Sequence, residues 1–183
     1  MQKSNIRKIS LQTRAYIKDK KNLSQKACER TLEYLEQKFP DNNLKIASFL
    51  SFNDELDTSL INKTINTHLP IIHPYKKHCI WFAKDTASYR KNKYGINEPL
   101  FTIQNIVAPW ELDIVIVPLV AFNEQKYRMG MGGGFYDYSF QFRKNLQEPV
   151  MIGIAFDEQQ NNDIIIDKYD LSLDVIITPT RVL

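Results

Sequence analysis

Four of the six glycines in this chain of 183 residues fall within the five positions 130–134. The cluster lies between the apolar segment 112–119, which is typical of a buried strand, and the segment 136–146, which favours a helix. Glycine permits positive φ and close approach of the main chain, so successive N–H groups and the start of the helix can surround an anion such as phosphate. The cluster therefore predicts an anion-binding loop, with a flexible connection as the alternative that glycine content alone allows.

The charged neighbours of the cluster favour the anion-binding loop. Arg128 precedes the glycines and Asp137 follows them. Arginine can hold phosphate oxygens and aspartate can hold a cation. No Lys-Ser or Lys-Thr pair follows the cluster, which excludes the P-loop, and the roughly ten residues between it and the preceding strand argue against a dinucleotide-binding fingerprint. A different kind of phosphate loop is required.

Strands and helices alternate along the rest of the chain, which predicts an α/β fold. We expect a single domain over residues 1–183, with a mostly parallel or mixed central sheet flanked by helices in an open α/β sandwich. The segment 84–100 lacks periodicity and is predicted to be a loop. The predicted helices cover 5–20, 24–39 with Ser24 as N-cap, and 58–67, and the further predicted strands cover 45–52, 69–75, 78–83, 150–156 and 175–178.

Composition limits the class of protein. The chain is 43% hydrophobic and 25% charged, as in a globular domain that can bury a sizeable core. Cys28 and Cys79 are too few for a disulfide framework and indicate buried thiols in a reducing compartment. The basic segment 1–21 has no apolar run of the kind found in signal peptides, so we expect a cytoplasmic protein, and we take it to be a monomer without membrane contacts.

The loop sequence R-x-G-M-G-G-G-F-Y-D, following V-P-L-V-A-F, resembles the signature of the 5-formyltetrahydrofolate cyclo-ligase family, also called methenyltetrahydrofolate synthetases. The resemblance covers nearly the whole chain. Its other parts are the N-terminal Lys3–Arg7, the acidic segment Phe52–Thr58, the turn Gly95–Pro99 and the C-terminal segments Phe156–Gln159 and Asp170–Asp174.

This resemblance implies an ATP-dependent and magnesium-dependent cyclisation of 5-formyltetrahydrofolate to 5,10-methenyltetrahydrofolate, with release of ADP and phosphate. It implies that Arg128 is catalytic, that Asp137 and Asp170 bind magnesium, and that Arg14 supports the ATP contacts. The implied ATP contacts are Lys3, Arg7, Arg128, Gly130, Gly132, Gly133, Gly134, Phe135 and Tyr136. The implied folate contacts are Phe52, Asp57, Met131, Gly132, Gly133, Gly134 and Phe135.

The chain departs from the family pattern at two positions. Lys126 stands where a turn glycine is common, and Tyr138 stands where an arginine commonly follows the aspartate. The missing arginine removes one phosphate or helix-cap contact, which Arg128, Lys3 and Arg7 have the charge to replace. Neither departure removes a catalytic acid or base.

Two other functions remain open from the residues alone. A nucleic-acid-binding module would use the aromatic and basic segments 75–77, 81–84 and 89–94, although a net charge of +3 is modest for such a protein. The same segments are also compatible with solvated lysines or with contacts to the glutamate tail of a folate. A sugar-phosphate isomerase would use the glycine loop for a monophosphate and need no ATP. The spacing of His68, His73 and His78 does not resemble a metal site.

Overall fold

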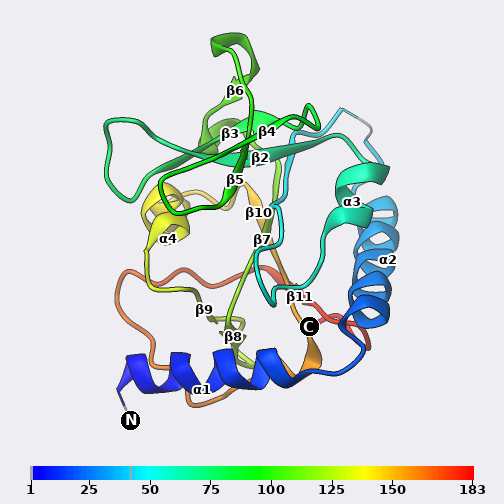
Figure 1. Cartoon of the computed structure of the whole chain (residues 1–183), viewed down its shortest axis with the longest axis vertical. Coiled ribbons are helices and arrows are strands. Elements are labelled where there is room, and N and C mark those ends of the chain that lie inside the picture. The colour runs from blue at the N-terminus through cyan, green and yellow to red at the C-terminus, as the bar shows by residue number, and fades with distance from the viewer. Residues whose placement is uncertain (1, 42) are drawn as a thin grey trace.

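A mixed sheet of seven strands runs through the part of the chain that the computed structural model describes, residues 2–41 and 43–183 (Figure 1). In spatial order the strands are β11 (Val175–Ile177), β10 (Val150–Ile154), β7 (Ile114–Val117), β1 (Ile46–Ala47), β2 (Thr67–Ile72), β3 (Ile80–Lys84) and β6 (Ile106–Val107). The pairings β11–β10, β10–β7, β7–β1 and β1–β2 are parallel, and the pairings β2–β3 and β3–β6 are antiparallel. The predicted fold class is confirmed.

Helices cover both faces of the sheet. In Figure 1, α2 (Lys20–Lys38) and α3 (Ser59–Thr64) lie to the right of the sheet, α4 (Phe135–Ser139) lies to the left, and α1 (Lys3–Tyr16) crosses below it. Smaller elements complete the chain. They are the strand pairs β4 (Tyr89–Lys91) with β5 (Asn97–Pro99) and β8 (Ala121–Phe122) with β9 (Arg128–Met129), and the 3-10 helices Ile103–Asn105, Pro109–Glu111, Gln141–Lys144 and Asp157–Gln159.

Strand β7 contributes side chains to the hydrophobic core on both faces of the sheet. Side chains alternate between the two faces of a strand. Val115 and Val117 accordingly pack in the cluster that holds Phe140, whereas Ile116 packs in the cluster that holds Cys28 of α2. All four residues of β7 are buried, which explains why its sequence is continuously apolar. Among the described residues, no helix is long and apolar enough to span a membrane.

The two cysteines are buried free thiols, as predicted. Cys28 donates a weak hydrogen bond from Sγ to the carbonyl oxygen of Asp57, 3.2 Å away. Burial raises the pKa of the Cys28 thiol to about 12, so this group is protonated at neutral pH. Cys28 therefore packs as a small apolar side chain in the core.

The segment 84–100, predicted to be a loop, contains the hairpin β4–β5. Glu98 fastens this hairpin to the sheet, because its Oε1 accepts hydrogen bonds from the Ile72 N–H at 2.8 Å and from the Asn92 side chain at 3.1 Å. Gly95 supplies the positive φ of 75° at the turn. The prediction was wrong because two strands of three residues carry almost no periodic signal.

Three other local predictions were wrong. The helix expected to begin at Ser24 begins at Lys20, and Ser24 lies buried within α2, where its Oγ accepts a hydrogen bond from the Asp57 N–H. The helix expected over 136–146 ends at Ser139 and is followed by a 3-10 helix. The strand expected over 45–52 pairs in the sheet only at Ile46 and Ala47. Short-range propensity does not fix these boundaries, because tertiary contacts decide them.

Lys126 adopts the backbone conformation that a glycine would favour. Its φ is +63°, in the left-handed region, and its N–H donates to the Asn123 carbonyl at 3.0 Å. The Lys126 ammonium group donates to the carbonyl oxygen of Asp174 at 3.0 Å. This departure from the family pattern thus keeps the turn and adds a contact that glycine lacks.

Gly153 of β10 provides a test of core packing. A Cβ at this position would lie 2.5 Å from Leu173 Cδ1 and 2.9 Å from Leu119 Cδ2. We expect Gly153→Ala to lower the free energy of unfolding by about 1 to 3 kcal/mol, because overpacking a buried site forces its neighbours to shift. Urea unfolding measures the change. Met151→Leu, a volume-conserving change on the same strand, is the control, and equal stability of the two variants would contradict this packing.

Candidate active site

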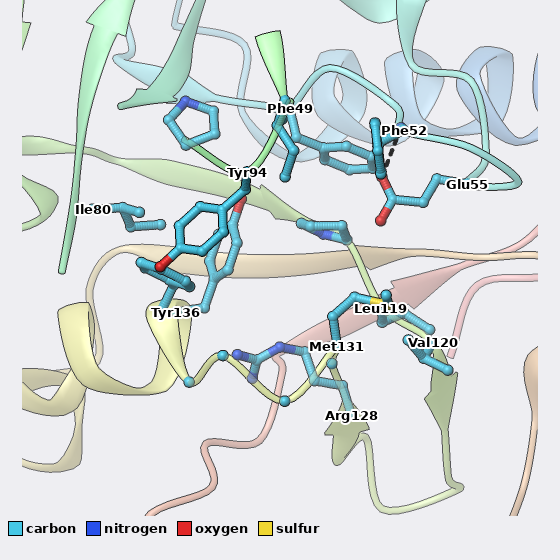
Figure 2. A pocket seen from close by; sticks show the side chains of 18 of the residues that line it. Phe49, Phe52, Glu55, Ile80, Tyr94, Leu119, Val120, Arg128, Met131 and Tyr136 are labelled. Carbon is cyan, nitrogen blue, oxygen red and sulfur yellow. Dashed lines mark hydrogen bonds between the residues drawn. The ribbon is translucent and has the colours of Figure 1, made fainter. Parts of the chain in front are cut away.

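A cleft of about 640 Å³ opens beside the carboxyl ends of β1, β2 and β7. This is the usual position for ligands of an open sheet with parallel strands. One wall is the glycine loop and another is the hairpin β4–β5. Figure 2 shows side chains from the segments after β1 and β7 converging with those of the loop. The cleft therefore joins the glycine loop to segments from distant parts of the chain.

The glycine loop needs glycine at its centre for two reasons. Gly132 and Gly134 have positive φ values of 94° and 67°. A Cβ on Gly132 would also lie 3.3 Å from Cζ of Arg7. Arg7 extends from α1 and donates from Nε to the carbonyl oxygen of Gly130 at 2.8 Å. The loop is thus open to the cleft and fixed from one side by a cation.

Arg128 and Asp137 form an ion pair across the two ends of this loop. Their Nη2 and Oδ1 atoms lie 3.1 Å apart, and only 4% of the Arg128 side chain is exposed. The Arg128 guanidinium also lies 5.9 Å from the centre of the Tyr136 ring and donates to the Leu171 carbonyl at 3.4 Å. Asp137 accepts from the Leu171 N–H at 3.4 Å. The Asp137 carboxylate and the Tyr136 ring therefore hold the buried Arg128 guanidinium in place.

Lys3 binds two carboxylates from the C-terminal part of the chain. Its Nζ lies 2.6 Å from Asp170 and 2.8 Å from Asp167. Desolvation lowers the pKa of Lys3, but the hydrogen bonds to Asp167 and Asp170 outweigh it and raise the pKa above its usual value. Asp167, which also lines the cleft, was not predicted from the sequence. Its spacing of three residues from Asp170 in an acidic segment was the available signal.

The two predicted magnesium ligands, Asp137 and Asp170, line the same cleft. Each is paired with a cation, Asp137 with Arg128 and Asp170 with Lys3. Among the described residues there is no group of three or more His, Cys, Asp or Glu side chains that could hold a metal ion. Magnesium is commonly held by one or two carboxylates and completed by water and substrate phosphates. Two carboxylates beside the glycine loop fit that requirement.

Apolar and aromatic side chains form the opposite part of the cleft. Phe49 is buried and Phe52 is 40% exposed, while Tyr94 of the hairpin meets Phe135 edge to face with ring centres 5.9 Å apart. Met131 reaches into the cleft from the glycine loop, as Figure 2 shows. Such a surface suits a flat aromatic ligand.

Glu55 is the carboxylate in this apolar part of the cleft (Figure 2). Its Oε2 accepts from the Phe52 N–H at 3.0 Å, and its Oε1 lies 4.0 Å from the buried guanidinium of Arg14. Burial raises the pKa of Glu55, although the Phe52 hydrogen bond and the Arg14 charge act to lower it. Oε1 faces a cleft where a ligand donor would satisfy it.

Asp57, expected to contact folate, lies outside the cleft lining. Its Oδ1 accepts from the Ser59 N–H at 2.9 Å, so it caps the start of α3. In Asp54-Glu55-Leu56-Asp57 the structure places Glu55, and not Asp57, in the cleft lining, because spacing in an irregular segment does not show which side chain faces a cleft. The other residues predicted to bind ATP or folate all line the cleft.

The hydroxyl of Tyr136 is buried in the cleft wall and has no hydrogen-bond partner among the described residues. Burial raises the pKa of Tyr136 above its usual value. The ring stacks on Phe140 with an angle of 13° between the planes. The Tyr136 hydroxyl is therefore a buried polar group that the ligand-free structure leaves without a partner among the described residues.

These features define an α/β enzyme that joins a glycine loop, two carboxylates and an apolar pocket in one cleft. The chain belongs to the 5-formyltetrahydrofolate cyclo-ligase family, whose sequence model matches residues 1–179. The family resemblance is therefore confirmed.

Relatives and solved structures agree with this assignment. The chain is 33% identical to the 5-formyltetrahydrofolate cyclo-ligase of Haemophilus influenzae over 96% of this chain and 95% of the relative. It is 33% identical to the Escherichia coli protein of that name over 75% of this chain and 79% of the relative. Its fold matches a 5,10-methenyltetrahydrofolate synthetase from Aquifex aeolicus with a TM-score of 0.77 and 26% identity, covering 100% of this chain and 92% of that one. A 5,10-methenyltetrahydrofolate synthetase from Mycoplasma pneumoniae shares the fold with a TM-score of 0.70 and 24% identity, covering 98% of this chain and 99% of that one.

The buried carboxyl of Glu55 predicts a pH-dependent effect on stability. An acid whose pKa is raised by folding stabilises the fold when protonated, and that contribution is lost as pH rises through the raised pKa. Glu55→Gln removes this loss, so we expect its Tm at pH 7 to exceed that of wild type. Below about pH 4.3, the ordinary glutamate pKa, the two Tm values converge. Calorimetry over this pH range measures the Tm of both proteins, and a lower Tm for the variant at pH 7 would contradict the expectation.

Proposed function

We propose that this protein converts 5-formyltetrahydrofolate and ATP to 5,10-methenyltetrahydrofolate, ADP and phosphate with magnesium. The observation that carries the proposal is the joining, in one cleft, of the cation-lined glycine loop and the apolar pocket with Glu55. An anion site alone would suit many reactions, whereas this combination suits transfer of a phosphoryl group to a flat, partly apolar acceptor. Family membership supports the same reaction.

The reaction requires positioning and charge neutralisation more than a protein nucleophile. The formyl oxygen attacks the γ-phosphorus of ATP and ADP leaves. The neighbouring folate nitrogen then attacks the formyl carbon and loses its proton, and the carbon–oxygen bond breaks to release phosphate. Phosphoryl transfer of this kind is accelerated by groups that orient the reactants and neutralise the transferring oxygens. The cleft supplies such groups.

The triphosphate occupies the loop side of the cleft in this proposal. Arg128 holds the transferring oxygens through its planar guanidinium and is the catalytic residue. Lys3 and Arg7 neutralise the remaining phosphate charge. Loop N–H groups donate to the phosphate oxygens, and Phe135 and Tyr136 complete the ATP contacts. The loop residues in contact with ATP are Gly130, Gly132, Gly133 and Gly134.

The folate occupies the apolar side. Phe52 and Phe135 contact the flat pterin, while Met131 and the adjacent glycines 132–134 contact the formyl end. Glu55 accepts hydrogen bonds from the donor edge of the pterin, the role that the sequence had given to Asp57. This assignment is supported by the position of Glu55 in the cleft and by the capping contact of Asp57.

Asp137 and Asp170 would hold the magnesium ion beside the triphosphate. When bound, magnesium neutralises charge on the phosphate oxygens during transfer. To hold the metal, Asp170 would release Lys3, which would then be free to contact phosphate. Asp137 retains Arg128 beside the transferring group. The two ion pairs of the ligand-free cleft thus hold the carboxylates ready for the metal.

The site is proposed to work in the cytoplasm, within a monomer. The buried free thiols support a reducing compartment. The nucleic-acid alternative loses its main support because several basic residues contact the chain's own aromatic rings. Lys76 lies over Tyr138, Arg90 over Phe101 and Lys93 over Tyr94.

A direct assay tests the function. Purified protein with magnesium, ATP and 5-formyltetrahydrofolate should generate the ultraviolet absorbance of the methenyl product together with ADP. Omission of any one component should abolish both signals. ADP release that does not depend on the formyl-folate would reject the proposal, and turnover of a sugar phosphate without ATP would support the isomerase instead.

Glu55 and Asp57 provide a matched pair of carboxylates for folate recognition. We expect Glu55→Ala to lower kcat/KM for 5-formyltetrahydrofolate roughly tenfold to a hundredfold, because a charged hydrogen-bond acceptor contributes about 1.5 to 3 kcal/mol. Asp57→Ala should keep wild-type folate kinetics and lose only about 1 kcal/mol of stability through its cap. Steady-state kinetics and urea unfolding measure the two effects. The reverse pattern would restore Asp57 to the folate site.

The two proposed metal ligands should differ in their effect on stability. Asp137→Asn and Asp170→Asn both weaken magnesium binding, with a loss of turnover at least as large as the roughly tenfold to hundredfold effect of outer-shell groups. Excess magnesium should restore part of the lost turnover. Only Asp137→Asn should also destabilise the fold, by about 1 to 3 kcal/mol, because it leaves Arg128 buried without its charge partner.

Magnesium titrations of activity and urea unfolding measure these effects. Asp163→Asn, which changes an exposed carboxylate of the same C-terminal segment, is the control. Wild-type turnover at limiting magnesium in either folded variant would remove that aspartate from the metal site.

A further inference from the structure

His78 binds the glycine loop from outside the cleft. It lies in the loop between β2 and β3, and its Nδ1 is 2.7 Å from the carbonyl oxygen of Gly133. A carbonyl oxygen only accepts hydrogen bonds, so the His78 ring donates and Nδ1 carries a proton. The backbone of His78 is in the left-handed region, with φ of 57°, which non-glycine residues adopt at an energetic cost.

His78 and Arg7 hold the glycine loop from separate parts of the fold. Arg7 of α1 donates to the Gly130 carbonyl at 2.8 Å, and His78 donates to the Gly133 carbonyl three residues later. The His78 ring also packs against Phe135, with ring centres 5.9 Å apart. A loop rich in glycine has large conformational entropy, and two donors at fixed positions reduce it.

The direction of the Gly133 carbonyl controls the direction of the next N–H group. The peptide unit is planar and trans, so the Gly133 C=O and the Gly134 N–H point in opposite directions. His78 does not line the cleft, whereas Gly133 and Gly134 do. A carbonyl that is held toward His78 therefore turns the Gly134 N–H away from His78.

We propose that His78 is a positioning residue that presents the Gly134 N–H group to a phosphate of ATP. The inference rests on the proposed function, because it takes ATP as the ligand of the loop. It assigns to His78 a role in ATP affinity that the family signature does not include. The same contact explains why a strained backbone conformation is kept at an exposed position.

Two substitutions separate the hydrogen bond from the backbone strain. Asparagine carries its Nδ2 on Cγ, as histidine carries Nδ1, and it tolerates positive φ, so His78→Asn keeps both the donor and the turn. His78→Gly keeps the turn and removes the donor. The pair is therefore matched for backbone and differs in the hydrogen bond to Gly133.

Calorimetric titration with magnesium and ATP, without folate, measures the effect. We expect His78→Gly to weaken ATP binding about threefold to tenfold, as expected for one lost hydrogen bond, and His78→Asn to stay within about twofold of wild type. Hydrogen exchange at the Gly134 amide should be faster in His78→Gly than in wild type or His78→Asn. Equal ATP affinity of wild type and His78→Gly, or equal weakening in both variants, would overturn the inference.

Wild-type protein in the same experiments distinguishes this inference from the proposed function. A wild type that turns over 5-formyltetrahydrofolate while His78→Gly keeps its ATP affinity rejects only the role of His78. A wild type that binds no ATP rejects the proposed function, and the hydrogen exchange of Gly134 then still reports whether His78 holds the loop. Unchanged exchange in His78→Gly rejects that contact as well.

Discussion

The ion pair between Arg128 and Asp137 fixes the geometry on which the cleft depends. A buried guanidinium is stable only when its charge is compensated, and Asp137 provides that charge from the far end of the glycine loop. The loop between them therefore begins and ends at fixed points despite its flexible sequence. Leu171 joins the pair through both its carbonyl and its N–H group, which brings the C-terminal segment to the same place.

A second charge contact joins the two ends of the chain. The N-terminal part of the sequence is basic and the C-terminal part is acidic, and Lys3 with Asp167 and Asp170 turns this asymmetry into a local ion-pair cluster at the cleft. The cluster places a cation and two carboxylates in the lining of the cleft. In the proposed function these are the groups that would meet phosphate and magnesium.

The fold was predictable where periodicity was strong and the elements were long. Strand β7 is apolar throughout because both of its faces are buried, so its sequence alone identified it. The hairpin β4–β5 was missed because Glu98, a charged residue, holds it to β2 through the Ile72 N–H, a contact between residues 26 positions apart. The early end of α4 was missed for a similar reason, since Phe140 leaves the helix to pack on Phe82 across the core.

Glycine spacing and charge are local properties, so the α/β fold and a glycine loop with Arg128 and Asp137 at its ends could be predicted from the sequence alone. The positions of Glu55 in the cleft and of Asp57 at the start of α3 depend on tertiary packing. The two acids are alike in charge and two residues apart, and the packing of their irregular segment against α1 and α2 sets which one faces the cleft. The tertiary structure also brought His78 to Gly133 across 55 positions, a contact that no local pattern in the chain encodes.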